Sequence, residues 1–533
     1  MIRENRLAQA TKMIRFLKHH AVLIGILFTA IVLRLAWLGS IPAGLSWDEA
    51  AIGYNGYGIV TVHRDEWLER MPITFKSFGD YKAAVAIYAD AVSTTILGIN
   101  PFAIRFPMMI AGVFTVFMAY WTALQLFEKR SPALVAAALV AVSPINIQFS
   151  RIAFESGIGV ALTSAGVAFF LSSRKKGWHL VVSAVFFVLS MYAYHSTKIV
   201  VPLLVPLLTL VYWKELKKQI VWIGVGAIIA LALLFPLLRE TFYGNAGARF
   251  YMTSAMMKQN ELLPLPQVFS VLVSNTTAHL SPRFLLFGAS TTLRHSTDKF
   301  GVLSYLEFVL ILIGLVQICH HLFRKFKNTQ GYPIKEILWV VLAMFIGLLP
   351  AIISNDVPNG NRAHGIVPWV QILAGYGFLQ CEVWICKQKN QKTLTSMFYT
   401  GVTVILILQT LLYTYWYVKT YSGTQAAKEF QYGYEEAVQF ARQKESEVHT
   451  VLFTSAYGQP YIFILLFKKL TPIQFHQGAL ANYEIRDLNW QNDRTRTNIL
   501  IVGTPKEIPE DAQHIVKEIR YPGGEVAFRI VEQ

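Results

Sequence analysis

Twelve apolar segments, most of them close to 20 residues long, dominate this chain of 533 residues. A helix of about 20 apolar residues spans the hydrocarbon core of a bilayer. Of all residues, 54% are hydrophobic and only 15% are charged, whereas soluble domains carry about 25% charged residues. The pattern therefore predicts a polytopic α-helical membrane protein. The segments lie at 20–38, 82–98, 102–126, 132–149, 156–173, 178–195, 197–213, 219–238, 302–322, 335–354, 364–386 and 394–417.

The net charge of +16 is consistent with membrane topology rather than with nucleic-acid binding. The basic residues form clusters between apolar segments, as Lys and Arg do in cytoplasmic loops. Residues 1–19 carry several of them and precede an apolar run without a small-residue cleavage site, so we expect a cytoplasmic N-terminus and an uncleaved first helix. We expect no nucleic-acid partner, and membrane lipids are the expected surroundings.

The basic loops also predict which segments cross the membrane. All of them can be cytoplasmic together with the N-terminus only if one segment before residue 102 does not cross. Segment 82–98 is short and carries Lys82 and Asp90, so we expect a re-entrant or interfacial helix on the outer side. About eleven crossings remain, and the C-terminus is expected outside. The basic loops are 128–130, 174–176, 214–218, 324–327 and 387–392, and the predicted outer loops are 39–101, 150–155, 195–198, 239–301 and 355–363.

Residues 418–533 are polar and differ in composition from the rest of the chain. A helical pattern covers about 424–446, and strand-like runs occupy 450–454, 498–502 and 526–531. These features predict a small extracytoplasmic α/β domain, for support or for acceptor docking.

Two adjacent acids, Asp48 and Glu49, follow the first apolar segment and open the outer loop 39–101. Carboxylates so near hydrocarbon are costly unless they face water, a partner or a substrate. A carboxylate in a partly dry cleft can act as a general base toward a hydroxyl acceptor. A solvated loop with two charges is the alternative.

Further ionisable residues lie in the other predicted outer loops. Glu155 could share the acceptor or, with Asp48, hold a divalent cation, or it could simply pair with Arg151 one helix turn away. Cations could stabilise a departing phosphate, or they could only anchor lipid head groups. These cations are Lys82, Arg105, Arg283, Arg294 with His295, and Arg362 with His364.

Five features of the sequence carry a family resemblance: the basic N-terminus, the early Asp-Glu pair, Lys82 before an apolar stretch, Arg151-x-Ala153-x-Glu155 and Leu293-Arg294-His295. Over roughly residues 20–420 the chain resembles the GT-C glycosyltransferases. Within them the chain looks most like the protein O-mannosyltransferase and aminoarabinose transferase group, described as dolichyl-phosphate-mannose-protein mannosyltransferase-like. The resemblance implies an inverting transfer of a sugar from a polyprenyl-phosphate donor to a hydroxyl acceptor on the outer face of the cell membrane.

The resemblance also implies roles for individual residues. Asp48 matches the catalytic base with Glu49 beside it, and Lys82 matches a lysine that contacts the carrier phosphate. Glu155 stands where relatives have Asp, and Arg294 with His295 matches a loop that orders over the carrier. Arg362 is a further candidate for the phosphate, and no protein acceptor is implied.

Two other functions fit parts of the pattern. A transporter or flippase of lipid-linked or polar solutes predicts mid-membrane ionisable residues and internal repeats. A polysaccharide polymerase or ligase uses a diphosphate-linked donor and relies on Arg and His of the outer loops.

Overall fold

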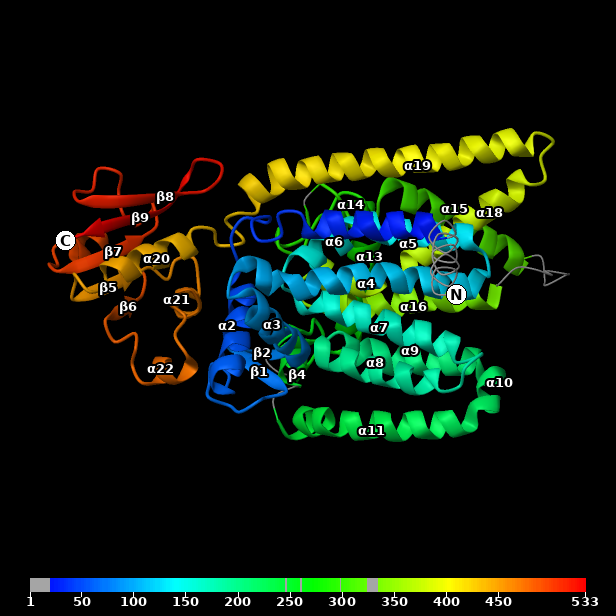
Figure 1. The fold of residues 1–533 in the computed structure, drawn as a ribbon, viewed down its shortest axis with the longest axis horizontal. Coiled ribbons are helices and arrows are strands. Elements are labelled where there is room, and N and C mark those ends of the chain that lie inside the picture. The colour runs from blue at the N-terminus through cyan, green and yellow to red at the C-terminus, as the bar shows by residue number, and fades with distance from the viewer. Residues whose placement is uncertain (1–19, 245–246, 259–260, 298, 324–333) are drawn as a thin grey trace, which may run out of the picture.

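The computed structural model describes residues 20–244, 247–258, 261–297, 299–323 and 334–533. The described chain forms a long helical bundle with a mixed α/β region at one of its ends (Figure 1). The helices of the bundle are His20–Leu35 and α2 Trp47–Val62, α3 Ala84–Leu97, α4 Pro101–Phe127, α5 Arg130–Val142, α6 Pro144–Arg151, α7 Glu155–Ser172, α8 His179–Ala193, α9 Thr197–Val211, α10 Trp213–Leu216, α11 Ile220–Tyr243, α12 Ala248–Thr253, α13 Leu265–Leu280, α14 Pro282–Leu285, α15 Tyr305–Phe323, α16 Ile334–Ile352, α17 Gly360–Ala363, α18 Trp369–Ile385 and α19 Gln391–Trp416.

Long apolar helices confirm a polytopic helical membrane protein. Six helices of the described chain are long and apolar enough to cross a bilayer, and the bent pair α5–α6 makes a seventh if it counts as one span. The helices His20–Leu35, α3, α8 and α9 are apolar but shorter, at 14 to 16 residues. The count of about eleven crossings therefore stays a prediction.

The break between α5 and α6 lies inside segment 132–149, which the sequence predicted as one helix. Pro144 has no N–H with which to continue the helix, and the axis bends by 52°. The carbonyl of Val140 accepts a hydrogen bond from Arg34 Nη2 at 3.1 Å, and the carbonyl of Ala141 accepts one from Arg34 Nη1 at 2.8 Å. The fully buried Arg34 thus satisfies the carbonyls that the bend exposes.

The two predicted long outer loops are largely structured. Residues 39–101 contain α2, α3 and a hairpin of β1 Thr74–Ser77 with β2 Asp80–Ala83. Residues 239–301 contain α12, α13, α14 and the short pair β3 Met257–Lys258 with β4 Glu261–Leu262. Helix α3 lies within segment 82–98, and its re-entrant or interfacial placement on the outer side stays a prediction.

The two ends of the bundle differ in what they carry (Figure 1). Helices α2 and α3 and the β1–β2 hairpin lie at the end that faces the C-terminal sheet, whereas α10 and the turn from α18 to α19 lie at the opposite end. Basic residues 214–218 and 387–392 belong to that opposite end. The predicted basic segments 1–19 and 324–327 fall outside the described residues.

The C-terminal region contains a sheet of five strands within residues 450–532, ordered β6-β5-β7-β9-β8. Strands β6, β5 and β7 are parallel, and β9 and β8 are antiparallel. Helix α21 packs between this sheet and α2 of the bundle, so the region is joined to the end that carries Asp48. The bounds are π-helix η3 Tyr417–Gln425, α20 Tyr434–Lys444, β5 Thr450–Phe453, α21 Pro460–Lys468, α22 Pro472–His476, β6 Tyr483–Ile485, α23 Trp490–Asp493, β7 Ile499–Gly503, β8 Ile515–Arg520 and β9 Val526–Glu532.

Candidate active site

Helix α2 begins with a capping box that fixes the Asp-Glu pair. The Ser46 hydroxyl accepts a hydrogen bond from Glu49 N, and the Glu49 carboxylate accepts one from Ser46 N at 3.0 Å. Such reciprocal bonds satisfy N–H groups that the first helical turn leaves without partners. Asp48 and Glu49 therefore occupy the first turn of a helix, where the negative charge is favourable.

Glu49 is fully buried and bound to Arg105, whose side chain is also fully buried. Arg105 donates to both carboxylate oxygens, at 2.8 Å and 3.2 Å, and to the carbonyls of Leu38, Pro42 and Gly44. The backbone N–H of Ala153 donates to the same carboxylate at 3.0 Å. Arg105 thus holds the chain around α2 and does not face an outer cleft, contrary to its prediction as a phosphate ligand.

Asp48 turns the other way and is 30% exposed. Its Oδ1 accepts a hydrogen bond from Lys82 Nζ at 2.5 Å, and Arg294 Nη1 lies 3.5 Å from its Oδ2. Lys82 is nearly buried at the end of the β1–β2 hairpin. The structure thus brings together a carboxylate and two cations that are 34 and 246 positions away in sequence.

Arg294 lies at the centre of this cluster. Its Cζ is 4.8 Å from the centre of the Trp47 ring, and its Nε is 3.8 Å from Glu429 Oε2. A guanidinium over an aromatic face is attracted by the ring, and it can still turn its donors toward a phosphate. Arg294 is therefore positioned to exchange one anionic partner for another.

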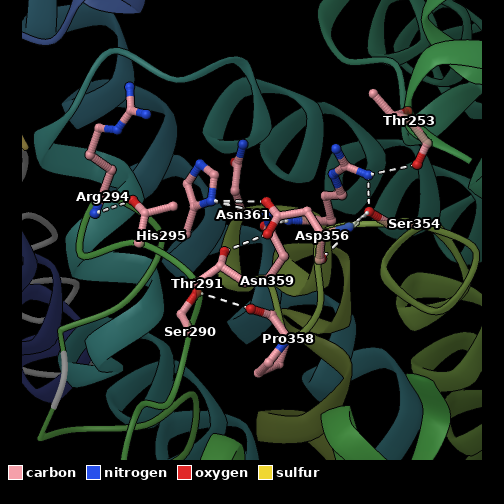
Figure 2. Close-up of polar contacts among 12 residues, drawn as sticks. Thr253, Ser290, Thr291, Arg294, His295, Ser354, Asp356, Pro358, Asn359 and Asn361 are labelled. Carbon is pink, nitrogen blue, oxygen red and sulfur yellow. Dashed lines mark hydrogen bonds and ion pairs between the residues drawn. The ribbon is translucent and has the colours of Figure 1, made fainter. Parts of the chain in front are cut away.

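The loop that carries Arg294 is fastened to residues 354–362 (Figure 2). Thr291 Oγ1 and Asn359 Nδ2 both donate to the Asp356 carboxylate, and His295 Nδ1 is 3.7 Å from Asp356 Oδ2. Burial and the neighbouring Arg294 cation lower the pKa of His295, which leaves its ring neutral at pH 7. In Figure 2 the Arg294 guanidinium points away from this network, so Asp356 anchors the loop without engaging that cation.

Arg362 lies apart from Asp48, in a second polar region. It donates to Ser354 Oγ and to the carbonyl of Thr253. Together with Lys198 and His195 it lines a cavity of about 210 Å³ between the N-terminal end of α9 and the C-terminal ends of α11 and α16. His195 Nε2 lies 2.9 Å from the carbonyl oxygen of Tyr81, the residue before Lys82. The cavity therefore adjoins the hairpin that carries Lys82.

Glu155 begins α7 and is nearly buried. One of its oxygens accepts a hydrogen bond from Ala83 N at 2.5 Å, so it fixes the hairpin directly after Lys82. Arg151 ends α6, and extended backbone separates the two residues. The Arg151 guanidinium donates to the carbonyls of Leu33, Arg34, Ala36 and Ile41. The predicted pairing one helix turn apart was therefore wrong.

The residues of this region do not fit a metal ion. Asp48 is neutralised by two cations, and Glu155 accepts a backbone hydrogen bond. In the part of the chain that the structure describes, no three His, Cys, Asp or Glu side chains come together in an arrangement suited to a metal.

Sequence reasoning missed three residues that contact the site from distant segments. Asp356 anchors the loop of Arg294, Glu429 pairs with Arg294, and Gln431 accepts a hydrogen bond from Trp47 N. Asp356 stands in a turn-forming run, 354–361, that could have drawn attention to it. The other two lie in a polar segment whose composition carries no such signal.

The bundle, the helices α2 and α3 at one of its ends and the appended sheet define a class of membrane protein. The chain has the fold of the GT-C glycosyltransferases, as the resemblance predicted. Residues 82–239 match the family described as dolichyl-phosphate-mannose-protein mannosyltransferase. The sequence has no significant match among curated proteins.

Two solved structures illustrate the likeness. ArnT from Cupriavidus metallidurans, bound to undecaprenyl phosphate, has a TM-score of 0.55 and 10% identity over 96% of this chain and 98% of that chain. The oligosaccharyltransferase of Archaeoglobus fulgidus in its apo form has a TM-score of 0.54 and 14% identity over 92% of this chain and 70% of that chain. A further structure of the archaeal enzyme, called AglB, holds an inhibitory peptide and a dolichol-phosphate and has a TM-score of 0.53 with 14% identity over 92% and 70% of the two chains.

Proposed function

We propose that this protein is an inverting glycosyltransferase that moves a sugar from a polyprenyl-phosphate donor to a hydroxyl acceptor on the outer face of the cell membrane. The observation that carries the proposal is the cluster of Asp48 with Lys82 and Arg294 at one end of a GT-C bundle. This cluster supplies both a base and the cations that a phosphate leaving group needs.

Asp48 acts as the general base in this mechanism. An Oδ atom takes the proton of the acceptor hydroxyl while the acceptor oxygen attacks the anomeric carbon. The bond from that carbon to the phosphate oxygen breaks, and its electron pair leaves with the phosphate. Attack on the face opposite the leaving group inverts the anomeric centre.

The two cations explain how donor binding prepares the base. Before the donor binds, Lys82 and Arg294 neutralise Asp48, and a carboxylate held in this way is a weak proton acceptor. A donor phosphate competes for the same N–H groups. Its binding therefore releases the Asp48 carboxylate at the moment when the reaction needs it, and Lys82 remains to stabilise the departing phosphate.

Two cavities lined in part by the same helices, α9 and α11, fit a lipid-linked donor. The polar cavity of about 210 Å³ with Lys198 and Arg362 lies at the outer ends of α9 and α11. An apolar groove of about 470 Å³ follows the same two helices inward, between Val201 and Thr209 on α9 and between Trp222 and Leu234 on α11. A phosphate with its sugar suits the first, and an isoprenoid chain suits the second.

The remaining residues have supporting roles. Glu49 fixes the first turn of α2 through Arg105, and Glu155 fixes the hairpin of Lys82. His295, which accepts a hydrogen bond from Asn359 Nδ2, and Thr291, which donates to Asp356, hold the loop of Arg294. About eleven crossings with a cytoplasmic N-terminus put the C-terminal region on the same outer side as this site. No step requires a metal ion.

Binding of the carrier tests the proposal. Purified protein in nanodiscs is titrated with undecaprenyl phosphate, undecaprenyl diphosphate and undecaprenol, and thermal unfolding is followed. The monophosphate is expected to stabilise the protein most, and Lys82→Met is expected to weaken its binding about tenfold or more. Lys76→Met is the matched control, because Lys76 is exposed on the neighbouring strand. Equal stabilisation by undecaprenol, or a preference for the diphosphate, would contradict the assignment of the donor.

A further inference from the structure

The segment that leads into the C-terminal sheet contacts the first turn of α2. Gln431 Oε1 accepts a hydrogen bond from Trp47 N at 2.7 Å. The Gln431 side-chain nitrogen donates to the carbonyls of Tyr457 and Gly458, at 2.8 Å and 3.2 Å. One buried amide therefore joins the residue before Asp48 to the loop between β5 and α21.

The backbone of Gln431 is held in an unusual conformation. Its φ of 49° lies in the left-handed region, which is uncommon for residues other than glycine. Such backbone persists only where surrounding contacts determine it. At Gln431 these contacts include the three hydrogen bonds of the side chain and one from its backbone N to the carbonyl of Lys428.

The same loop also contacts the Trp47 side chain. Gly458 has a φ of 76°, and a Cβ atom at that position would lie 2.7 Å from Trp47 Cζ3. The Trp47 ring thus meets Gly458 of the C-terminal region and Arg294 of the proposed site. Glu429, two residues before Gln431, lies 3.8 Å from Arg294.

We propose that Gln431 and Gly458 are positioning residues for sugar transfer, so that the C-terminal region completes the active site and does not only pack against the bundle. Trp47 and Asp48 are consecutive residues of one helical turn, and the hydrogen bond at Trp47 N ties that turn to the C-terminal region. Displacement of a reacting group by about 1 Å can cost about a hundredfold in rate. The inference rests on the proposed function, because it assigns to these contacts the placement of Asp48 as base.

Two independent substitutions perturb Trp47 from the C-terminal side. Gln431→Ala removes the acceptor at Trp47 N. Gly458→Ala leaves all three hydrogen-bonding groups in place but inserts a Cβ against the Trp47 ring. The matched controls are Gln439→Ala, an exposed glutamine on α20, and Gly478→Ala, whose glycine has a φ of 87° and space for a Cβ with no heavy atom within 4 Å. Gly478→Ala therefore introduces the same backbone strain without touching Trp47.

The assay measures release of undecaprenyl phosphate from undecaprenyl-phosphate-mannose by full-length protein in membranes that supply the acceptor. Each perturbing variant is expected to lower kcat at least tenfold, with the KM for the donor within twofold and an unfolding midpoint within 2 °C of its matched control. Gln431→Glu keeps an acceptor for Trp47 N but loses both donors, and we expect it to recover part of kcat.

The outcomes separate this inference from the proposed function. If the wild-type protein releases no undecaprenyl phosphate from lipid-linked mannose or from other monophosphate-linked sugars, the proposed function fails. If the wild type is active and both Gln431→Ala and Gly458→Ala match their controls in kcat, the positioning role is overturned. The positioning role is also overturned if, in both variants, kcat falls only in proportion to a fall in the unfolding midpoint. Ordinary loss of folded protein then explains the lower kcat.

Discussion

Removal of Arg105 tests how the acidic turn of α2 is held. Arg105 and Glu49 are both fully buried, and five hydrogen bonds run from the guanidinium to the Glu49 carboxylate and three carbonyls. Arg105→Gln leaves the carboxylate buried with only backbone and hydroxyl partners. Breaking a buried pair by removing one partner costs about 3–5 kcal/mol, and we expect a loss of that size in the free energy of unfolding.

A double-mutant cycle isolates the pair from the other contacts. Unfolding of the detergent-solubilised protein is followed for Arg105→Gln, Glu49→Gln and the double variant. Because the double variant removes both charges, its loss is expected to be smaller than the sum of the single losses by about 2 kcal/mol or more. Coupling below about 0.5 kcal/mol would refute the reasoning, since that is the range of exposed pairs. Lys428 and Glu525 form an exposed pair, and the same cycle with Lys428→Ala, Glu525→Ala and the double variant provides that comparison.

Two further predictions concern pH and topology. Burial raises the pKa of Glu66 to about 7 from 4.5. The folded state therefore keeps a proton that the unfolded state releases above pH 4.5, and the free energy of unfolding falls by about 3 kcal/mol as pH rises from 4.5 to 7. Glu66→Gln keeps the acceptor for Tyr461 and should match the wild-type unfolding midpoint at pH 4.5 and exceed it at pH 8.5, whereas equal midpoints at pH 8.5 would contradict this. The exposed Cys386 near the basic turn before α19 should resist an impermeant thiol reagent added to intact cells, whereas Asp511→Cys should react; the reverse pattern would contradict the predicted sidedness.

The bundle helices were predicted well where the sequence carries boundary signals. Segment 102–126 corresponds to α4, Pro101–Phe127, whose start is set by the Asn100 cap and Pro101 in the first turn. Segment 132–149 was predicted as one helix, although Pro144 breaks it. Apolar composition alone does not distinguish a kinked helix from two helices. The carbonyls that the break exposes are satisfied by Arg34, which belongs to another segment, so the local sequence does not show what stabilises the break.

Helix α2 lies in a stretch that was predicted as part of an outer loop, and its sequence contains three glycines, which disfavour helix. Close packing explains why it is helical. A Cβ on Gly53 would lie 2.6 Å from Ile104, one on Gly58 would lie 2.6 Å from the carbonyl oxygen of Arg64, and one on Gly56 would collide with the Asp90 carboxylate. The glycines therefore allow neighbouring elements to approach the helix, and tertiary contacts outweigh the local preference.

The candidate site was predictable only in part. The Asp-Glu pair was visible from its place after an apolar segment, but its division into an outward Asp48 and a buried Glu49 depends on helical geometry that the loop prediction lacked. The contacts of Arg294 and Gln431 with the start of α2 join positions 246 and 384 residues apart. A single sequence holds no signal for pairings at such distances.

Sugar transfer by Asp48→Asn tests the central claim most directly. The measurement is kcat for release of undecaprenyl phosphate from a monophosphate-linked sugar that the wild-type protein uses, with Asp511→Asn as an exposed control. Asparagine has nearly the shape of aspartate but cannot take the acceptor proton, so we expect kcat to fall by about 10²–10⁴-fold, with the KM for the donor unchanged or lower because Lys82 and Arg294 lose a competing anion. A kcat for Asp48→Asn equal to that of the control would contradict the account.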